Sequence, residues 1–374
     1  MIALKWLVAV AGVALLGADL YDLVRALVVP RPHTTGPVAI ASREIRRHLH
    51  RIVGRIPSFD RRDHILTTAE PMVMLARLAI WLSAGLVGFA FVIWSTGNTS
   101  FGHSFIESGS SIFTLGFATE NHPAPEVLSF LAAAFGLLVV ALQIAYLPAL
   151  YDSFNRRETL VTMLESRAGT PAWGPELLAR HYLVGIEGNL GSFYDDWERW
   201  SADVAESHTT YPALLYMRSP HPTNSWLVGL IAVLDSAALY LSVSPSVAPP
   251  EARLCVRMGF TCLRDIARAI HLPYDPDPRP DADIALPFED FVEAIARLKE
   301  ATVPIERTAE EAWAHFRGWR VNYESIAYML TDIVFAPPAA WTGPRRYPDS
   351  DTDAARFPRR PVDRRPGQPE GRTV

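Results

Sequence analysis

Residues 108–120 read SGSSIFTLGFATE, and this stretch decides how the rest of the chain is interpreted. It lies between two apolar segments, residues 72–94 and 127–150, and contains neither lysine nor arginine. A helix of about 20 apolar residues is long enough to cross the hydrocarbon core of a bilayer. The sequence therefore predicts two membrane-spanning helices joined by a short loop.

Five residues carry the specific signal of this stretch: Thr114, Leu115, Gly116, Phe117 and Ala118. The sequence TLGFA resembles the filter of the tetrameric potassium channels, which reads TVGYG and coordinates the ion with backbone carbonyl groups. The resemblance extends over residues 70–150. It implies a homotetrameric channel for monovalent cations, with K⁺ held at the filter carbonyls only and no other metal or cofactor. Ala118 replaces the second glycine of the family pattern, and Thr119 replaces the aspartate that commonly follows it.

A filter made of carbonyl groups places demands on its backbone. Successive carbonyls point the same way only if some residues take a positive φ, which glycine adopts without a Cβ clash. Gly116 meets this demand. Ala118 is expected to take positive φ at the outer position, at a cost of about 1 kcal/mol per subunit relative to glycine. That strain favours outer carbonyls that turn away, and therefore fewer ordered ion sites.

A short pore helix is predicted to lead into this loop. Ser104 and Glu107 have the spacing of a capping box, which predicts that the helix begins at Ser104. Ser110 and Ser111 lie close to its end. The C-terminal end of such a helix carries the negative end of the helix dipole, which favours a cation beyond it.

The segment 127–150 is expected to line the inner pore. Gly136 lies near the position of the family's hinge glycine, although a small residue at a helix–helix contact explains it equally well. Pro148 is interpreted either as a bend at a gate or as the point where the helix leaves the membrane.

A third apolar segment covers residues 1–30. A cleaved signal peptide is the competing interpretation, because Lys5 precedes an apolar core. The apolar run continues to Val29, which is long for a signal peptide and favours a first transmembrane helix. The expected fold is therefore an all-α membrane protein with three transmembrane helices, and with the pore helix and re-entrant loop between the second and third, in a pore domain of residues 71–150.

The flanking charges predict the orientation of these helices. Arginines are concentrated between residues 31 and 62 and return at Arg156 and Arg157, whereas residues 96–124 contain no lysine or arginine. Basic residues near membrane spans favour the cytoplasmic side. The N-terminus and the TLGFA loop are thus expected outside, and the C-terminal domain inside, in the plasma membrane of a bacterium (its inner membrane).

The cytoplasmic link of residues 31–70 has the pattern of an amphipathic helix. Its apolar face is formed by Ile45, Leu49, Ile52, Val53 and Ile56, and its basic face includes Arg43, Arg46, Arg47 and Arg51. Such a helix can lie on a membrane with its arginines on anionic lipid headgroups. Docking on the protein's own soluble domain and nucleic-acid binding are the alternatives. The net charge of −5 does not favour nucleic acid as a partner.

Residues 151–342 are predicted to form an all-α cytoplasmic domain. Helices are expected over residues 158–168, 174–187, 191–207, 225–242, 250–271, 286–301 and 306–335. Residues 226–241 are apolar enough to suggest a fourth span, but the segment is short and contains Asp235, so a buried core helix is favoured. The tail of residues 343–374 is rich in proline and charge and is expected to be disordered.

Other motifs in this part give no support for further chemistry. The glycines at 185, 188 and 191 lack the strand and spacing of a dinucleotide-binding loop. The aspartates of residues 275–283 lack the glycine and glutamate of an EF-hand. No nucleophile and base form a recognisable catalytic group, so an enzyme is not expected. A membrane-anchored interaction or signalling protein with a degenerate, non-conducting pore loop remains the alternative to a channel.

Overall fold

The computed structural model describes residues 2–29, 35–119 and 122–343, and within these ranges the chain is helical without a strand. It forms two compact units: residues 1–53 with 68–152, and residues 54–67 with 153–374. Of the predicted tail, residues 343–374, all but the first residue lie outside the described residues. Helix α6 (Pro123–Ala168) contributes to both units, because the division falls within it.

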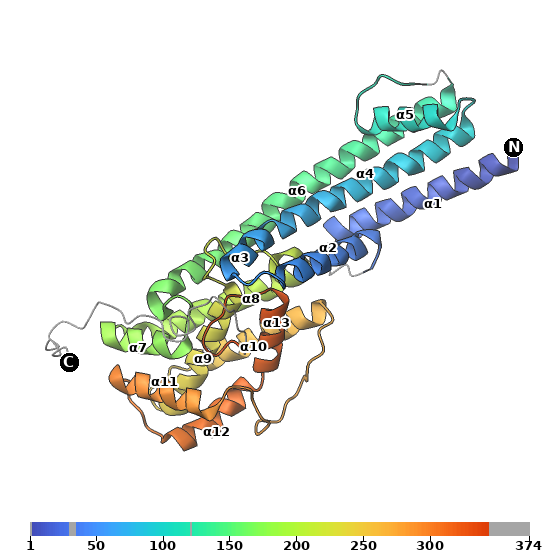
Figure 1. The fold of residues 1–374 in the computed structure, drawn as a ribbon. Helices are drawn as coiled ribbons and strands as arrows, with labels where there is room; N and C mark the ends of the chain where they lie inside the picture. The colour runs from blue at the N-terminus through green and yellow to red at the C-terminus, as the bar shows by residue number, and fades with distance from the viewer. Residues whose placement is uncertain (1, 30–34, 120–121, 344–374) are drawn as a thin grey trace. The chain divides into compact units, whose positions relative to one another are not determined.

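The first unit contains α1 (Ile2–Leu27), α2 (Pro37–Val53), α4 (Ala69–Thr96), α5 (Phe101–Ile112) and the first part of α6. Helices α1 and α4 lie side by side in opposite directions (Figure 1). Near one end Lys5 Nζ donates to the carbonyl of Gly97 at 2.7 Å, and further along Trp81 Nε1 donates to Asp22 Oδ2 at 3.0 Å. A Cβ added to Gly12 would lie 2.8 Å from the carbonyl oxygen of Gly88, so glycine allows these helices to approach closely.

Four stretches of helix are long and apolar enough to cross a membrane. They are α1, residues Phe59–Thr96, α6 and α9 (Trp226–Val243). Of the 18-residue apolar stretch in α1, and of that in α6, only 22% is buried within the chain, whereas the apolar stretch of α9 is entirely buried. The prediction that residues 226–241 form a core helix is confirmed, and the pattern of the other helices is that of a multi-pass membrane protein.

The second unit is built around α9. It contains α3 (Phe59–Thr67), the end of α6, α7 (Gly174–Val184), α8 (Leu190–Thr210), α10 (Glu251–Ala269), α11 (Phe288–Glu300), α12 (Ala309–Arg320) and α13 (Glu324–Ile333), with short 3₁₀ turns at Glu187–Asn189 and Pro212–Leu215. Helices α7, α10, α12 and α13 pack against α9. Because α9 is covered on every side, its residues are apolar throughout rather than along one face.

Two expected helix boundaries are wrong. The helix predicted over residues 306–335 is interrupted, since α12 ends at Arg320 and α13 begins at Glu324. The side-chain amide nitrogen Nδ2 of Asn322 donates to the carbonyls of Gly318 and Trp319, and such bonds compete with helical backbone bonds. Residues 127–150 and 158–168, expected as separate helices, are parts of the single helix α6.

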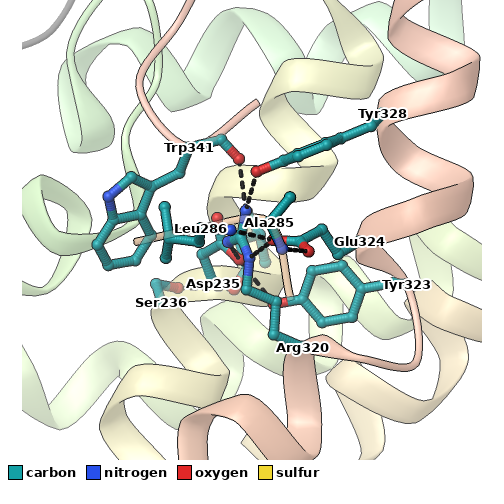
Figure 2. A network of polar contacts seen from close by, with 10 residues as sticks. Asp235, Ser236, Ala285, Leu286, Arg320, Tyr323, Glu324, Tyr328 and Trp341 are labelled. Carbon is teal, nitrogen blue, oxygen red and sulfur yellow. Dashed lines mark hydrogen bonds and ion pairs between the residues drawn. The ribbon is translucent and has the colours of Figure 1, made fainter. Parts of the chain in front are cut away.

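A buried ion network joins α9, α12 and α13 (Figure 2). The Arg320 guanidinium is fully buried and pairs with Asp235 through Nη1 and with Glu324 through Nε at 2.7 Å. Tyr323 also donates its hydroxyl to Asp235 at 2.6 Å. Burial lowers the pKa of Arg320, but Asp235 and its other partners raise that pKa more, so it lies well above its usual value and the group is charged.

The same arginine holds the end of the described chain. Its Nη2 donates to the carbonyl of Trp341 at 2.6 Å and to the hydroxyl of Tyr328 at 2.9 Å (Figure 2). Glu324 accepts from the backbone N–H groups of Ala285 and Leu286, so it fixes the loop before α11. Each buried charge of this network therefore has several partners. Removing one member leaves the charges of the others uncompensated in the low-dielectric interior.

Candidate functional site: the loop that follows helix α5

Helix α5 begins earlier than its sequence suggests. It starts at Phe101, and Ser100 is the N-cap residue, its hydroxyl accepting from the N–H of His103 at 3.4 Å. The capping box expected at Ser104 and Glu107 is wrong, because both residues lie inside the helix and are fully buried. Burial gives these polar residues a packing role in place of the end-capping role that their spacing indicated.

Polar side chains of α5 fasten it to both neighbouring helices. Ser108 Oγ donates to the carbonyl of Leu86 on α4 at 2.9 Å. Ser129 on α6 donates its hydroxyl to Glu107 Oε1, also at 2.9 Å. The side chain of Ile112 is buried in a cluster with residues of α4 and α6, namely Phe89, Ile93 and Ala132. Helix α5 is therefore held on two sides, and its C-terminal end has a defined position.

Ser110 organises the loop that follows. Its backbone carbonyl accepts from the N–H groups of Leu115 at 2.7 Å and Gly116 at 3.3 Å. Its side-chain hydroxyl accepts from the N–H groups of Phe117 at 2.9 Å and Ala118 at 3.2 Å. The N–H groups of four consecutive residues are thus directed at one serine. Ser111 accepts from the N–H of Thr114 at 2.9 Å in the preceding turn.

The carbonyl groups of residues 114–118 differ from the N–H groups of this loop in their hydrogen bonding. In the part of the chain that the structure describes, none of the carbonyl oxygens of residues 114–118 accepts a hydrogen bond. Backbone carbonyls that have no donor within the protein bind either water or a cation. The carbonyl oxygens of this loop, which follows α5, are therefore available to a partner outside the described residues.

The backbone reaches this arrangement through two positive φ angles. Gly116 has φ 71°, as expected, but the second is at Thr114, with φ 56°. The expectation of positive φ at Ala118 is wrong, since this residue is not among those with positive φ. A β-branched residue in the left-handed region is rare and strained, and such strain gathers at functional sites.

Large apolar side chains on the loop are uncovered within the single chain. Phe113, Leu115 and Phe117 expose 51%, 63% and 69% of their surface, whereas Ala118 is buried. Apolar groups clustered in this way mark a surface that another protein or a lipid covers.

Gly136 lies where α6 meets the end of α5. A Cβ placed on it would be 2.1 Å from the carbonyl oxygen of Ile112, which is far inside contact distance. This close approach explains the glycine by packing, the second of the two interpretations from the sequence. Pro148 lies inside α6, and the helix continues beyond it.

The arginines of the link divide into two groups. Arg46 forms a two-bonded pair with the buried carboxylate of Glu70, with distances of 2.7 and 2.9 Å. This arginine therefore binds protein in the first unit, where α2 packs against α4. Arg43, Arg47 and Arg51 are exposed, and Arg47 is paired with Glu44 on the same helix.

Comparisons with protein-family models, curated proteins and solved structures give no match to the chain. Within the described residues, no group of three or more His, Cys, Asp or Glu side chains is placed to hold a metal ion. Two supports of the 114–118 loop, Ser129 and Leu86, could not be found from the sequence, because both act through contacts distant along the chain.

A second group of buried polar side chains lies in the second unit, around Arg157 of α6. The guanidinium of Arg157 is fully buried and contacts Glu158, with Nε to Oε1 at 2.8 Å, and His208 Nε2 at 3.1 Å. Since arginine only donates, His208 accepts with Nε2 and is neutral. Burial, with the neighbouring Arg157 charge, lowers the pKa of His208 well below its usual value.

This arrangement predicts that acid destabilises the second unit. Below pH ~6.5 the unfolded chain binds a proton at His208 that the folded chain does not, so stability falls by about 1.4 kcal/mol per pH unit for this residue. We expect His208→Gln, which keeps an acceptor for Arg157, to show a shallower slope in urea unfolding between pH 7.5 and 5.5. His181, whose pKa burial also lowers, contributes equally in both proteins. Identical slopes would contradict the assignment.

Proposed function

We propose that this protein is a homotetrameric channel for monovalent cations, in which the loop of residues 114–118 from each subunit forms a carbonyl filter. The observation that carries the proposal is the loop itself: the N–H groups of residues 115–118 donate to Ser110, while the carbonyl oxygens of residues 114–118 have no donor among the described residues. A dehydrated cation needs several oxygen ligands in a ring, and identical loops around a symmetry axis supply them.

The surroundings of the loop support this proposal. It follows α5, whose C-terminal end is electronegative. Together with α5, the loop lies between α4 and α6, which belong to stretches of helix long and apolar enough to span a membrane. The exposed Phe113, Leu115 and Phe117 side chains give each loop an apolar surface that neighbouring subunits can cover. K⁺ is the favoured ion because TLGFA resembles the potassium-channel filter.

The conformation of Ala118 favours a second candidate, a membrane-anchored interaction or signalling protein with a non-conducting loop. Ala118 does not take positive φ, and it is buried. Its backbone therefore lacks the left-handed conformation that a filter residue at this position is expected to take. A channel with this loop has fewer ordered ion sites than the family pattern implies, and modest selectivity for K⁺ over Na⁺ follows.

Substitutions at residues 116 and 118 test whether this loop is the filter. Gly116→Ala forces a side chain onto φ 71°, at a cost of about 1–2 kcal/mol in each subunit, and is expected to abolish or scramble permeation. Ala118→Gly permits the outer carbonyl to turn inward and is expected to raise the K⁺/Na⁺ permeability ratio. Reversal potentials of purified protein in planar bilayers measure both effects.

Gly102→Ala is the matched control, since a Cβ at this position of α5 meets nothing within 4 Å. A conducting protein whose reversal potential is unchanged in both filter variants would show that these residues are not the filter. Protein that inserts as a tetramer and never conducts would favour the non-conducting candidate.

The proposed topology places the loop outside, and the link and helical unit in the cytoplasm of a bacterium, with the N-terminus outside. Single cysteines at Asn98 and Asp60, in a chain lacking Cys255 and Cys262, are expected to react with an impermeant thiol reagent from opposite sides of the membrane. Reaction of both from one side removes the pore-loop hypothesis. The exposed Arg43, Arg47 and Arg51 suit anionic lipid at the inner surface, whereas Arg46 is engaged by Glu70.

A further inference from the structure

A short segment of the second unit, residues 214–218, touches several other parts of that unit. It consists of the end of the 3₁₀ turn Pro212–Leu215 and the residues that follow it. Two buried arginines meet there, one from α6 and one that belongs to the segment itself. Both arginines bind backbone carbonyls as well as carboxylates, so they connect the main chain of separate elements.

The first connection runs from α6 to the segment. Arg157 donates from Nη1 to the carbonyl of Leu214 at 2.7 Å and from Nη2 to the carbonyl of Met217 at 2.9 Å. Its guanidinium lies over the rings of Phe154 and Trp226, at 5.1 and 5.6 Å. Its planar donor fork therefore fixes α6 to the backbone of the 214–218 segment.

The second connection runs from the segment to α3. Arg218 pairs through Nε with Asp63, and both side chains are about nine-tenths buried. The guanidinium lies 5.8 Å from the centre of the Phe59 ring, at the start of the same helix. Helix α3 ends at Thr67, and α4 begins at Ala69, so a single residue separates the held helix from the start of α4.

The third connection runs to the end of α13. Arg218 Nη1 donates to the carbonyl of Val334 at 2.9 Å, and both Nη atoms donate to the carbonyl of Phe335 at 3.2 Å. Val334 and Phe335 directly follow Ile333, the last residue of α13, so Arg218 binds the main chain where this helix ends. One side chain thus joins α3 to the group of helices that surrounds α9.

We infer that residues 214–218 form a coupling element, through which the helical unit controls the two chain segments that lead to the filter loop. One segment is α3, which continues into α4, and the other is α6, which follows the loop directly. A change in α13 displaces Arg218, Arg218 displaces Asp63, and the Leu214 and Met217 carbonyls carry the same displacement to Arg157. The regulatory consequence rests on the proposed channel function, whereas the mechanical coupling does not.

Hydrogen–deuterium exchange on the full-length protein in detergent tests the coupling without any measurement of current. In Arg218→Ala, amides of residues 59–67 and 330–336 are expected to exchange faster, because their partner is removed. The decisive peptide covers residues 154–161 of α6, which Arg218 does not touch. We expect its exchange to rise on the order of tenfold, through loosening of the segment that Arg157 holds.

Arg199→Ala is the matched control, because Arg199 forms an exposed ion pair with Asp195 on α8. It is expected to change none of the three peptides. Asp63→Asn is the milder variant, which keeps a hydrogen-bond acceptor and is expected to act in the same direction if Arg218→Ala fails to fold. Faster exchange confined to residues 59–67 and 330–336 would overturn the coupling.

Single-channel recording then tests the regulation. In a conducting protein, Arg218→Ala is expected to change the open probability on the order of tenfold while the reversal potential stays constant. An unchanged open probability together with altered exchange in α6 would overturn the regulatory role. Wild-type protein that does not conduct counts against the proposed function alone, and the exchange result still decides the coupling.

Discussion

Arg320→Leu is expected to destabilise the second unit strongly. The substitution leaves the carboxylates of Asp235 and Glu324 buried without their cation and frees the carbonyl of Trp341. Breaking a buried ion pair on one side costs about 3–5 kcal/mol, which is a large part of the roughly 5–15 kcal/mol that stabilises a typical domain. The loss of free energy of unfolding is measured by urea denaturation of the full chain in detergent.

Two companion variants make this result specific. Arg279→Leu removes an exposed arginine that pairs with Asp281 and is expected to leave the unfolding midpoint unchanged. The double variant Arg320→Leu with Asp235→Leu removes both charges of the buried pair. It is expected to lose less stability than the sum of the single variants, because no lone charge remains from that pair. Additive losses would show that Arg320 and Asp235 are not coupled.

Gly136→Ala is expected to disrupt the position of α5. The added methyl group would lie 2.1 Å from the carbonyl oxygen of Ile112, and the contact is with backbone rather than with a side chain that can rotate away. Overpacking of this kind costs about 1–3 kcal/mol and sometimes more. Since Ile112 is the last residue of α5, the displacement passes directly to the loop. Thermal unfolding and the fraction of assembled oligomer in detergent measure the effect.

The control for Gly136 is Gly17 on α1, where an added Cβ meets nothing within 4 Å. Gly17→Ala removes the lower helix propensity of glycine and is expected to leave stability unchanged or slightly higher. If Gly136→Ala unfolds and assembles as the wild type does, α6 does not approach the end of α5 as closely as described here.

Features that depend on local pattern were predicted well from the sequence. The length and apolarity of α1, α4 and α6 identified them, and the short apolar run containing Asp235 was expected to be the buried helix that α9 is. Gly116 was expected at positive φ because glycine is the residue that adopts it without strain. Each of these signals lies within one turn or one helix of the residue concerned.

Features that depend on distant partners were missed. Ser104 and Glu107 have the spacing of a helix start, but burial against α4 and α6 places them inside α5, and Ser100 takes the cap. Arg46 has the exposed pattern of a lipid-facing arginine, yet Glu70 binds it from another helix. Spacing along a sequence describes neighbours on one element, so it carries no information about which residue a second element supplies.

The apolar sequence of helix α9 bears on membrane insertion of the nascent chain. Its hydropathy is equal to that of α1. The machinery that inserts apolar helices into the membrane therefore encounters two segments of similar apolarity. Asp235 lies near the middle of α9, where an aspartate adds about 2.5–3.5 kcal/mol to the cost of insertion into a bilayer. The carboxylate that later pairs with Arg320 therefore also discourages lateral release of this helix into lipid. One residue thus serves both the biogenesis and the mature core of the protein.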